Sequence, residues 1–149
     1  MRIALKYGLL ITLVVVGWIV LVRFILHLGP DAKLNLGAPL LFNLTAFFST
    51  LFGIRERKRE LGEGFTFKEG LRTGAMISFV YAVSACLFFF IEFLVAGPKL
   101  LMSDVGPQSR PMWQVALMAY AGLFLGAMIF GVIYSALCAF VLAKQKTES

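Results

Sequence analysis

Two ionisable side chains stand inside long apolar stretches of this sequence. Glu92 is the only acid within such a stretch, and Arg23 is the only base well inside one. Each precedes a Gly-Pro pair, at residues 29–30 for Arg23 and 97–98 for Glu92. Ionisable groups surrounded by hydrocarbon are costly, so they are candidates for ion or proton sites.

Two interpretations of this pair stay open. An unpaired charge is costly in lipid, so Arg23 and Glu92 could meet directly or through a water molecule. Alternatively, Arg23 extends separately to the outer headgroups, and Glu92 does the same or is protonated. The sequence alone does not decide between them.

Further polar residues come at a similar depth, and they complete a candidate intramembrane polar cluster. The cluster consists of Arg23, His27, Asn43, Glu92 and Tyr120. It could bind a substrate, hold a proton, or supply only interhelical hydrogen bonds worth about 1 kcal/mol each. We favour the last interpretation, and a lone histidine near an interface is more often a satisfied polar group than a ligand.

Motifs for catalysis are missing. The sequence lacks H-E-x-x-H, G-x-S-x-G, a P-loop and paired metal ligands. Cys86 and Cys138 fall within apolar stretches and are typical of small packing residues. We therefore expect no enzyme, no cofactor and no metal site.

Four long apolar stretches must position these side chains. Hydrophobic residues make up 60% of the chain and charged residues 15%, whereas soluble proteins have about a quarter charged. The stretches lie at about residues 7–28, 36–54, 73–96 and 112–143, and a bilayer core takes about 20 helical residues to cross. They are continuous rather than alternating, which favours helices over barrel strands. The sequence predicts one all-α domain over residues 1–149, with four transmembrane helices in two antiparallel hairpins.

The first stretch also fits a signal peptide, because Arg2 and Lys6 precede it. It is longer than the usual apolar region of such peptides, however, and no A-x-A-like site follows. We therefore expect a membrane span.

Basic residues predict the orientation of these spans. The N-terminus, the central loop and the C-terminal tail share ten of the fourteen Lys and Arg residues. Loops rich in Lys and Arg stay cytoplasmic, so both termini and the central loop should lie inside, in a bacterial inner membrane. The net charge of +6 then reflects topology and gives no case for nucleic acid. The expected partners are membrane lipid and other membrane proteins or further copies of this chain.

The central loop is the polar connector "GIRERKRELGEGFTFKEGLRTG". Its basic residues are Arg55, Arg57, Lys58 and Arg59, followed by Lys68 and Arg72. The second helix should run past the membrane to Leu61 and stop at Gly62. Thr66 and Glu69 have the spacing of a capping box, which predicts that the third helix begins at Phe67. We expect Phe65 and Phe67 at the level of the lipid headgroups.

Small residues recur at four-residue steps in the last two stretches. The rows include Gly74, Ser78 and Ala82 in the third stretch, Gly131 and Ser135 in the fourth, and a second pair, Gly122 and Gly126. Such rows let helices approach closely in lipid. We expect the third and fourth helices to pack tightly, with Gly122 and Gly126 left for the first helix or for another protomer.

The connector carries a resemblance to a known family. With two apolar spans on each side, the pattern "GIR…G…TFKEG…G" resembles a family of small four-helix bacterial membrane proteins, common in Bacteroidetes and catalogued as a domain of unknown function. The resemblance implies a fold and a membrane location but no site. The function we expect is a structural, accessory or assembly role in an oligomer or larger membrane complex. The alternative is a minor transporter or channel component with a polar site in the outer half of the bundle.

Overall fold

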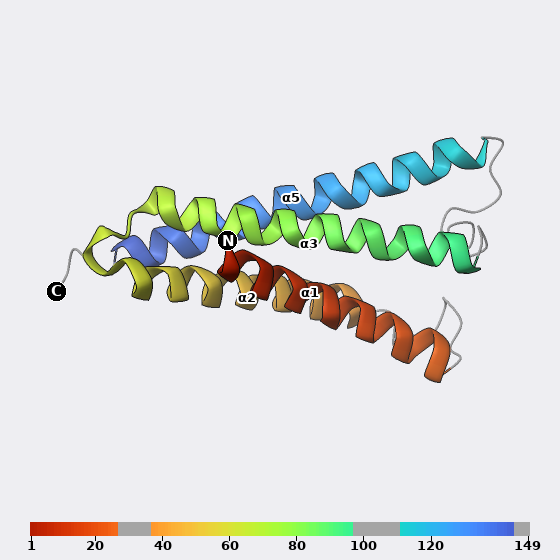
Figure 1. Cartoon of the computed structure of the whole chain (residues 1–149), viewed down its shortest axis with the longest axis horizontal. Coiled ribbons are helices and arrows are strands. Elements are labelled where there is room, and N and C mark those ends of the chain that lie inside the picture. The colour runs from red at the N-terminus through yellow and green to blue at the C-terminus, as the bar shows by residue number, and fades with distance from the viewer. Residues whose placement is uncertain (27–36, 97–110, 145–149) are drawn as a thin grey trace.

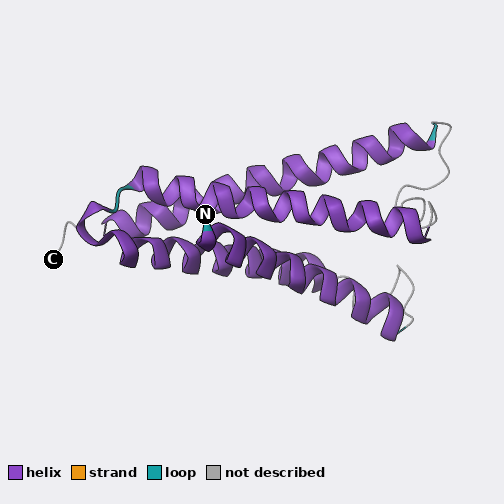
Figure 2. Cartoon of the chain, in the orientation of Figure 1, coloured by secondary structure: helices purple, strands orange, loops and turns teal. Residues whose placement is uncertain are grey.

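The computed structural model of the chain describes residues 1–26, 37–96 and 111–144. These residues form helices and no strands, as Figure 2 shows. The long helices are α1 (Arg2–Val20), α2 (Ala38–Leu61), α3 (Phe67–Ala96) and α5 (Met112–Lys144). A π-helical turn, η1 (Leu21–Ile25), extends α1, and a short 3₁₀ turn, η3 (Gly62–Gly64), follows α2. The prediction of an all-α fold is confirmed.

Each of these four helices is long and apolar enough to cross a membrane. Their outward side chains are large and apolar; for example, Leu13 is 71% exposed and Phe140 is 63% exposed. Such a surface suits hydrocarbon rather than water, because a soluble protein rarely exposes large contiguous apolar patches. The protein is a multi-pass membrane protein.

The helices form two antiparallel pairs, α1 with α2 and α3 with α5 (Figure 1). The most extensive interface joins α3 and α5, while α1 packs on α3 and α2, and α2 also packs on α5. We call the end that carries η3 the connector end. The two pairs lie together there and diverge toward the opposite end, which we call the far end (Figure 1).

The connector follows the sequence-based prediction. Helix α2 ends at Leu61, and Gly62 then takes φ +53°, a conformation that glycine adopts without strain. The Glu69 backbone N–H donates to the Thr66 hydroxyl oxygen over 3.3 Å, which caps the first turn of α3. The predicted stop at Gly62 and the predicted start at Phe67 are both confirmed.

Phe65 departs from its predicted place at the headgroups. It is only 4% exposed, and it packs in a cluster with Ile54, Cys138 and Leu142. Its ring lies 3.0 Å from the point that a Cβ on Gly70 would occupy. The missing side chain of Gly70 therefore gives the ring room to enter the bundle, whereas Phe67 stays exposed.

Candidate functional site

The seam between α3 and α5 is built on glycines facing small side chains. A methyl group on Gly74 would overlap the Ser135 side chain, and one on Gly131 would overlap the Ser78 side chain. Both serine hydroxyls donate to the backbone carbonyl four residues earlier on their own helix, so neither is left without a partner. Ala82 is fully buried in α3. The two helix backbones therefore approach closely, as van der Waals packing in lipid requires.

Glycines also bring the first two helices to α3. A Cβ on Gly8 would lie 2.7 Å from the Val80 Cβ, so α1 touches α3 at this point. A Cβ on Gly53 would lie 3.1 Å from the Tyr7 ring and would overlap Ile77. In the connector half of the bundle, the helices therefore pack closely against one another at glycines.

Gly122 and Gly126 behave differently. A Cβ on either glycine would meet no described atom within 4 Å. They line a hollow of about 280 Å³ between α2, α3 and α5. The second small-residue row of α5 therefore borders open space within the described bundle.

The same hollow is lined by a polar pair from two helices. The Tyr134 hydroxyl on α5 donates to the Asn43 side-chain oxygen on α2 over 2.7 Å. The Asn43 amide nitrogen in turn donates to the Pro39 carbonyl over 2.7 Å. Sequence reasoning missed Tyr134, although a tyrosine inside an apolar span is itself a signal, because its buried hydroxyl needs a partner.

Tyr120 and Glu92, two further residues of the predicted polar cluster, lie close enough to interact electrostatically. The Tyr120 hydroxyl donates to the Phe89 carbonyl over 3.2 Å, which links α5 to α3. Glu92 lies on α3 and is partly exposed. Arg23 falls in η1, but its side chain lies outside the described part of the structure, and so does the whole of His27. The pairing of Arg23 with Glu92 stays a prediction.

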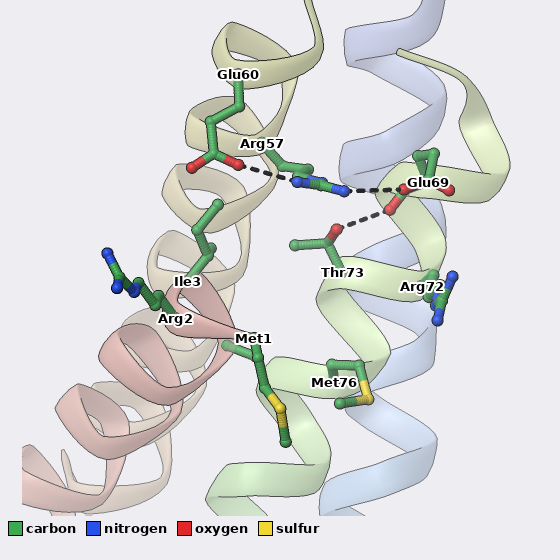
Figure 3. A pocket seen from close by; sticks show the side chains of 10 residues that line it. Met1, Arg2, Ile3, Arg57, Glu60, Glu69, Arg72, Thr73 and Met76 are labelled. Atoms are coloured by element: carbon green, nitrogen blue, oxygen red, sulfur yellow. Dashed lines mark hydrogen bonds and ion pairs between the residues drawn. The ribbon is translucent and has the colours of Figure 1, made fainter. Parts of the chain in front are cut away.

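The basic connector joins helices to one another. The Arg57 guanidinium lies 3.0 Å from the Glu60 carboxylate and 3.6 Å from that of Glu69, so it ties α2 to α3 (Figure 3). The Lys58 ammonium donates to the Leu142 carbonyl over 2.6 Å and so ties α2 to α5. Arg55 and Arg59 are exposed.

Glu56, just beyond the second apolar stretch, ties α2 to α1. Its carboxylate accepts hydrogen bonds from the Lys6 ammonium over 2.8 Å and the Tyr7 hydroxyl over 2.7 Å. These bonds stabilise the charged carboxylate and lower the pKa of Glu56, the bond from Lys6 having the larger effect. Together with Arg57 and Lys58, Glu56 joins α2 to the other three long helices at the connector end.

Most of this chain matches a known protein family. A family model described as "Protein of unknown function (DUF4199)" matches residues 6–103. The chain belongs to this family. No curated protein matches it, and no solved structure does.

The DUF4199 match contains the connector, α2, α3 and most of α1, but it stops before α5. Gly122, Gly126 and Tyr134 therefore lie outside the matched residues. Within the described part of this DUF4199 chain, no group of three His, Cys, Asp or Glu side chains could hold a metal ion. Hydrogen bonds from Tyr134 to Asn43 and from Tyr120 to the Phe89 carbonyl join helices within the spans, so the geometry supports helix association.

Proposed function

We propose that this protein has a structural or assembly role in the bacterial inner membrane, and that copies of it associate through the far half of α5. Both termini and the connector would lie on the cytoplasmic side, in keeping with the excess of Lys and Arg there. Each helix pair already satisfies its backbone internally, so association must rest on side-chain packing.

The open glycine row of α5 carries the proposal. Gly122 and Gly126 stand four residues apart on one face, where a G-x-x-x-G pair lets a second helix approach closely. Leu125 and Ile129 flank them and are 58% and 59% exposed. Unlike Gly74 and Gly131, neither of these two glycines would bring a side chain against another helix within the described residues. The face therefore has the chemistry of a helix interface without an internal partner.

A second copy of the chain is the occupant that suits this face. Copies inserted with the same topology are related by an axis along the membrane normal, which sets α5 parallel to α5. Parallel crossing is the arrangement of the known right-handed G-x-x-x-G dimer. Side chains beside the glycines of one copy would then enter the hollow of the other.

The test compares three glycine variants. Gly122→Leu and Gly126→Leu each put a bulky side chain on the proposed interface, and Gly17→Leu is the matched control, because Gly17 also meets no described atom within 4 Å. Subunits are counted in lipid bilayers by single-molecule photobleaching. We expect dimers for the wild type and for Gly17→Leu, and monomers for the two α5 variants.

Each other outcome has a defined meaning. A monomeric wild type overturns self-association, and dimers that survive both α5 substitutions place the interface elsewhere. If instead a different membrane protein co-purifies with the wild type and is lost from the α5 variants, the second copy is the wrong occupant.

A minor transporter or channel component is the second candidate, and the Asn43–Tyr134 hydrogen bond beside the hollow favours it. Glu92→Gln separates the two functions. Proton flux into liposomes, followed with a pH-sensitive dye, should fall in a transporter whose assembly is unchanged. An assembly protein should show no such flux in the wild type.

A further inference from the structure

A second hollow, of about 440 Å³, lies at the connector end, and we call it the connector-end pocket. It is bounded by the first turn of α1, the last turns of α2 and the first turns of α3. Figure 3 shows it from close by. Its lining combines arginines, glutamates and methionines, which is an amphipathic set of side chains.

One wall of the pocket consists of charged side chains that form ion pairs with one another. Arg57 lies between Glu60 and Glu69 and contacts both carboxylates (Figure 3). Both acids of the lining are therefore held by the same guanidinium. A bound anion would therefore meet two carboxylates whose charges are partly neutralised by Arg57.

Arg2 and Arg72 supply the available positive charge. They line the pocket from α1 and α3, and both side chains are exposed. Among the described residues neither forms an ion pair. The three arginines outnumber the two glutamates, so the lining is net positive. A net positive lining suits an anion such as a phosphate diester.

Apart from Thr73, the remaining side chains of the lining are apolar, which favours an anion that carries hydrocarbon chains. Met1, Ile3 and Met76 border the pocket, and Met1 and Met76 lie across from Arg57 in Figure 3. Met76 belongs to the apolar stretch that begins at about residue 73, so this side of the pocket continues into the membrane. Methionine is flexible and fills irregular space, which suits contact with acyl chains.

We infer that the connector-end pocket binds an anionic phospholipid. Arg2 and Arg72 extend on opposite sides of the pocket (Figure 3) and attract the phosphodiester from both sides by their charge. Met1 and Met76 contact the first carbons of the acyl chains. The site is independent of the α5 face and places a lipid against α1 and α3 at the membrane surface.

The experiment measures lipid binding to the full chain in a neutral detergent. Phosphatidylglycerol and phosphatidylcholine are titrated in turn, and bound lipid is counted by native mass spectrometry. The Arg2→Gln/Arg72→Gln variant removes the available charge of the pocket. The matched control is Arg55→Gln/Arg59→Gln, which removes the same charge from exposed residues of the connector that do not line the pocket.

We expect the wild type and the control to prefer phosphatidylglycerol over phosphatidylcholine. The pocket variant should lose affinity for phosphatidylglycerol at least tenfold, since each basic residue near an anionic lipid contributes a factor of about five. Inorganic phosphate at matched concentration should not displace the lipid. Displacement by inorganic phosphate would instead identify a site for a soluble anion.

Two further results would overturn the inference. One is an equal loss of affinity for phosphatidylglycerol in the control variant, which would indicate attraction by general surface charge. The other is a wild type that binds phosphatidylglycerol and phosphatidylcholine equally. If the pocket variant does not fold, the wild type is photolabelled with a phosphatidylglycerol that carries a diazirine near the headgroup. Adducts should then map to residues 1–4 and 72–76, and labelling confined to other residues excludes the site.

Discussion

Helical glycines serve two different purposes in the two halves of this bundle. In the connector half, a side chain on any glycine of the four long helices would collide with a neighbouring helix. These glycines are Gly8, Gly53, Gly70, Gly74 and Gly131. In the far half, Gly17, Gly122 and Gly126 meet no described atom within 4 Å. Glycine therefore allows close helix packing in the connector half, whereas in the far half it leaves helix surfaces that no described neighbour covers.

Polar contacts divide in a similar way. At the connector end, charged groups of α2 bond to each of the other three helices through Glu56, Arg57 and Lys58. Within the described parts of the spans, neutral groups such as Tyr134 and Tyr120 form hydrogen bonds between helices. The close glycine contacts and the charged contacts between helices therefore stabilise the connector end, while the far half remains available for association.

The largest expected effect is at the α3–α5 seam. Gly131→Leu should lower the free energy of unfolding by about 1–3 kcal/mol or prevent folding, because Ser78 and the facing backbone cannot move away. Unfolding in mixed micelles, followed by circular dichroism, measures the change. Gly17→Leu is the control and should stay close to the wild type. Equal tolerance of both substitutions would contradict the division into two halves.

A smaller effect is expected where α2 meets the end of α5. Lys58→Met removes the hydrogen bond to the Leu142 carbonyl and a positive charge near a helix C-terminus, which should cost about 1 kcal/mol. The same unfolding measurement applies. Arg59→Met removes a neighbouring exposed charge and should be nearly silent. If the two variants lose the same stability, the Lys58 bond adds nothing to the connector end.

The smallest effect is expected beside the hollow. Tyr134→Phe removes the hydrogen bond to Asn43 and should cost about 0.6 kcal/mol, the average for such bonds in membrane proteins. Asn43→Leu breaks the same bond, so the double variant should lose less than the sum of the single losses. A loss as large as that of Gly131→Leu would show that the far half is also held tightly from within.

The sequence predicts the helices of this protein well, because their signals are local. A continuous apolar stretch identifies a span by its length. Gly62, Thr66 and Glu69 mark the helix ends on each side of η3 through the backbone conformation of the glycine and the side-chain cap of the threonine. The facing rows of Gly74 and Ser135 could also be proposed, since the four-residue spacing places small residues on one side of each helix.

Which side of each helix faces which neighbour is harder to predict. In a soluble bundle the polar face points to water, but here every face is apolar because lipid covers the outside. The sequence thus left open whether Gly122 and Gly126 would meet the first helix, and it missed Tyr134 as the partner of Asn43. Phe65 was misplaced for a related reason: its burial depends on the space above Gly70, which only the packed helices define.

The turn η3 has one practical consequence, for spectroscopy and labelling. Gly64 is exposed, a Cβ there would meet no described atom within 4 Å, and its backbone does not need the positive φ of Gly62. A thiol introduced as Gly64→Cys would be exposed, whereas Cys138 is buried and Cys86 is partly buried. A membrane-impermeant maleimide could then label one position at the tip of the molecule. In sealed vesicles of known orientation, that label would report which compartment the tip faces without disturbing a helix.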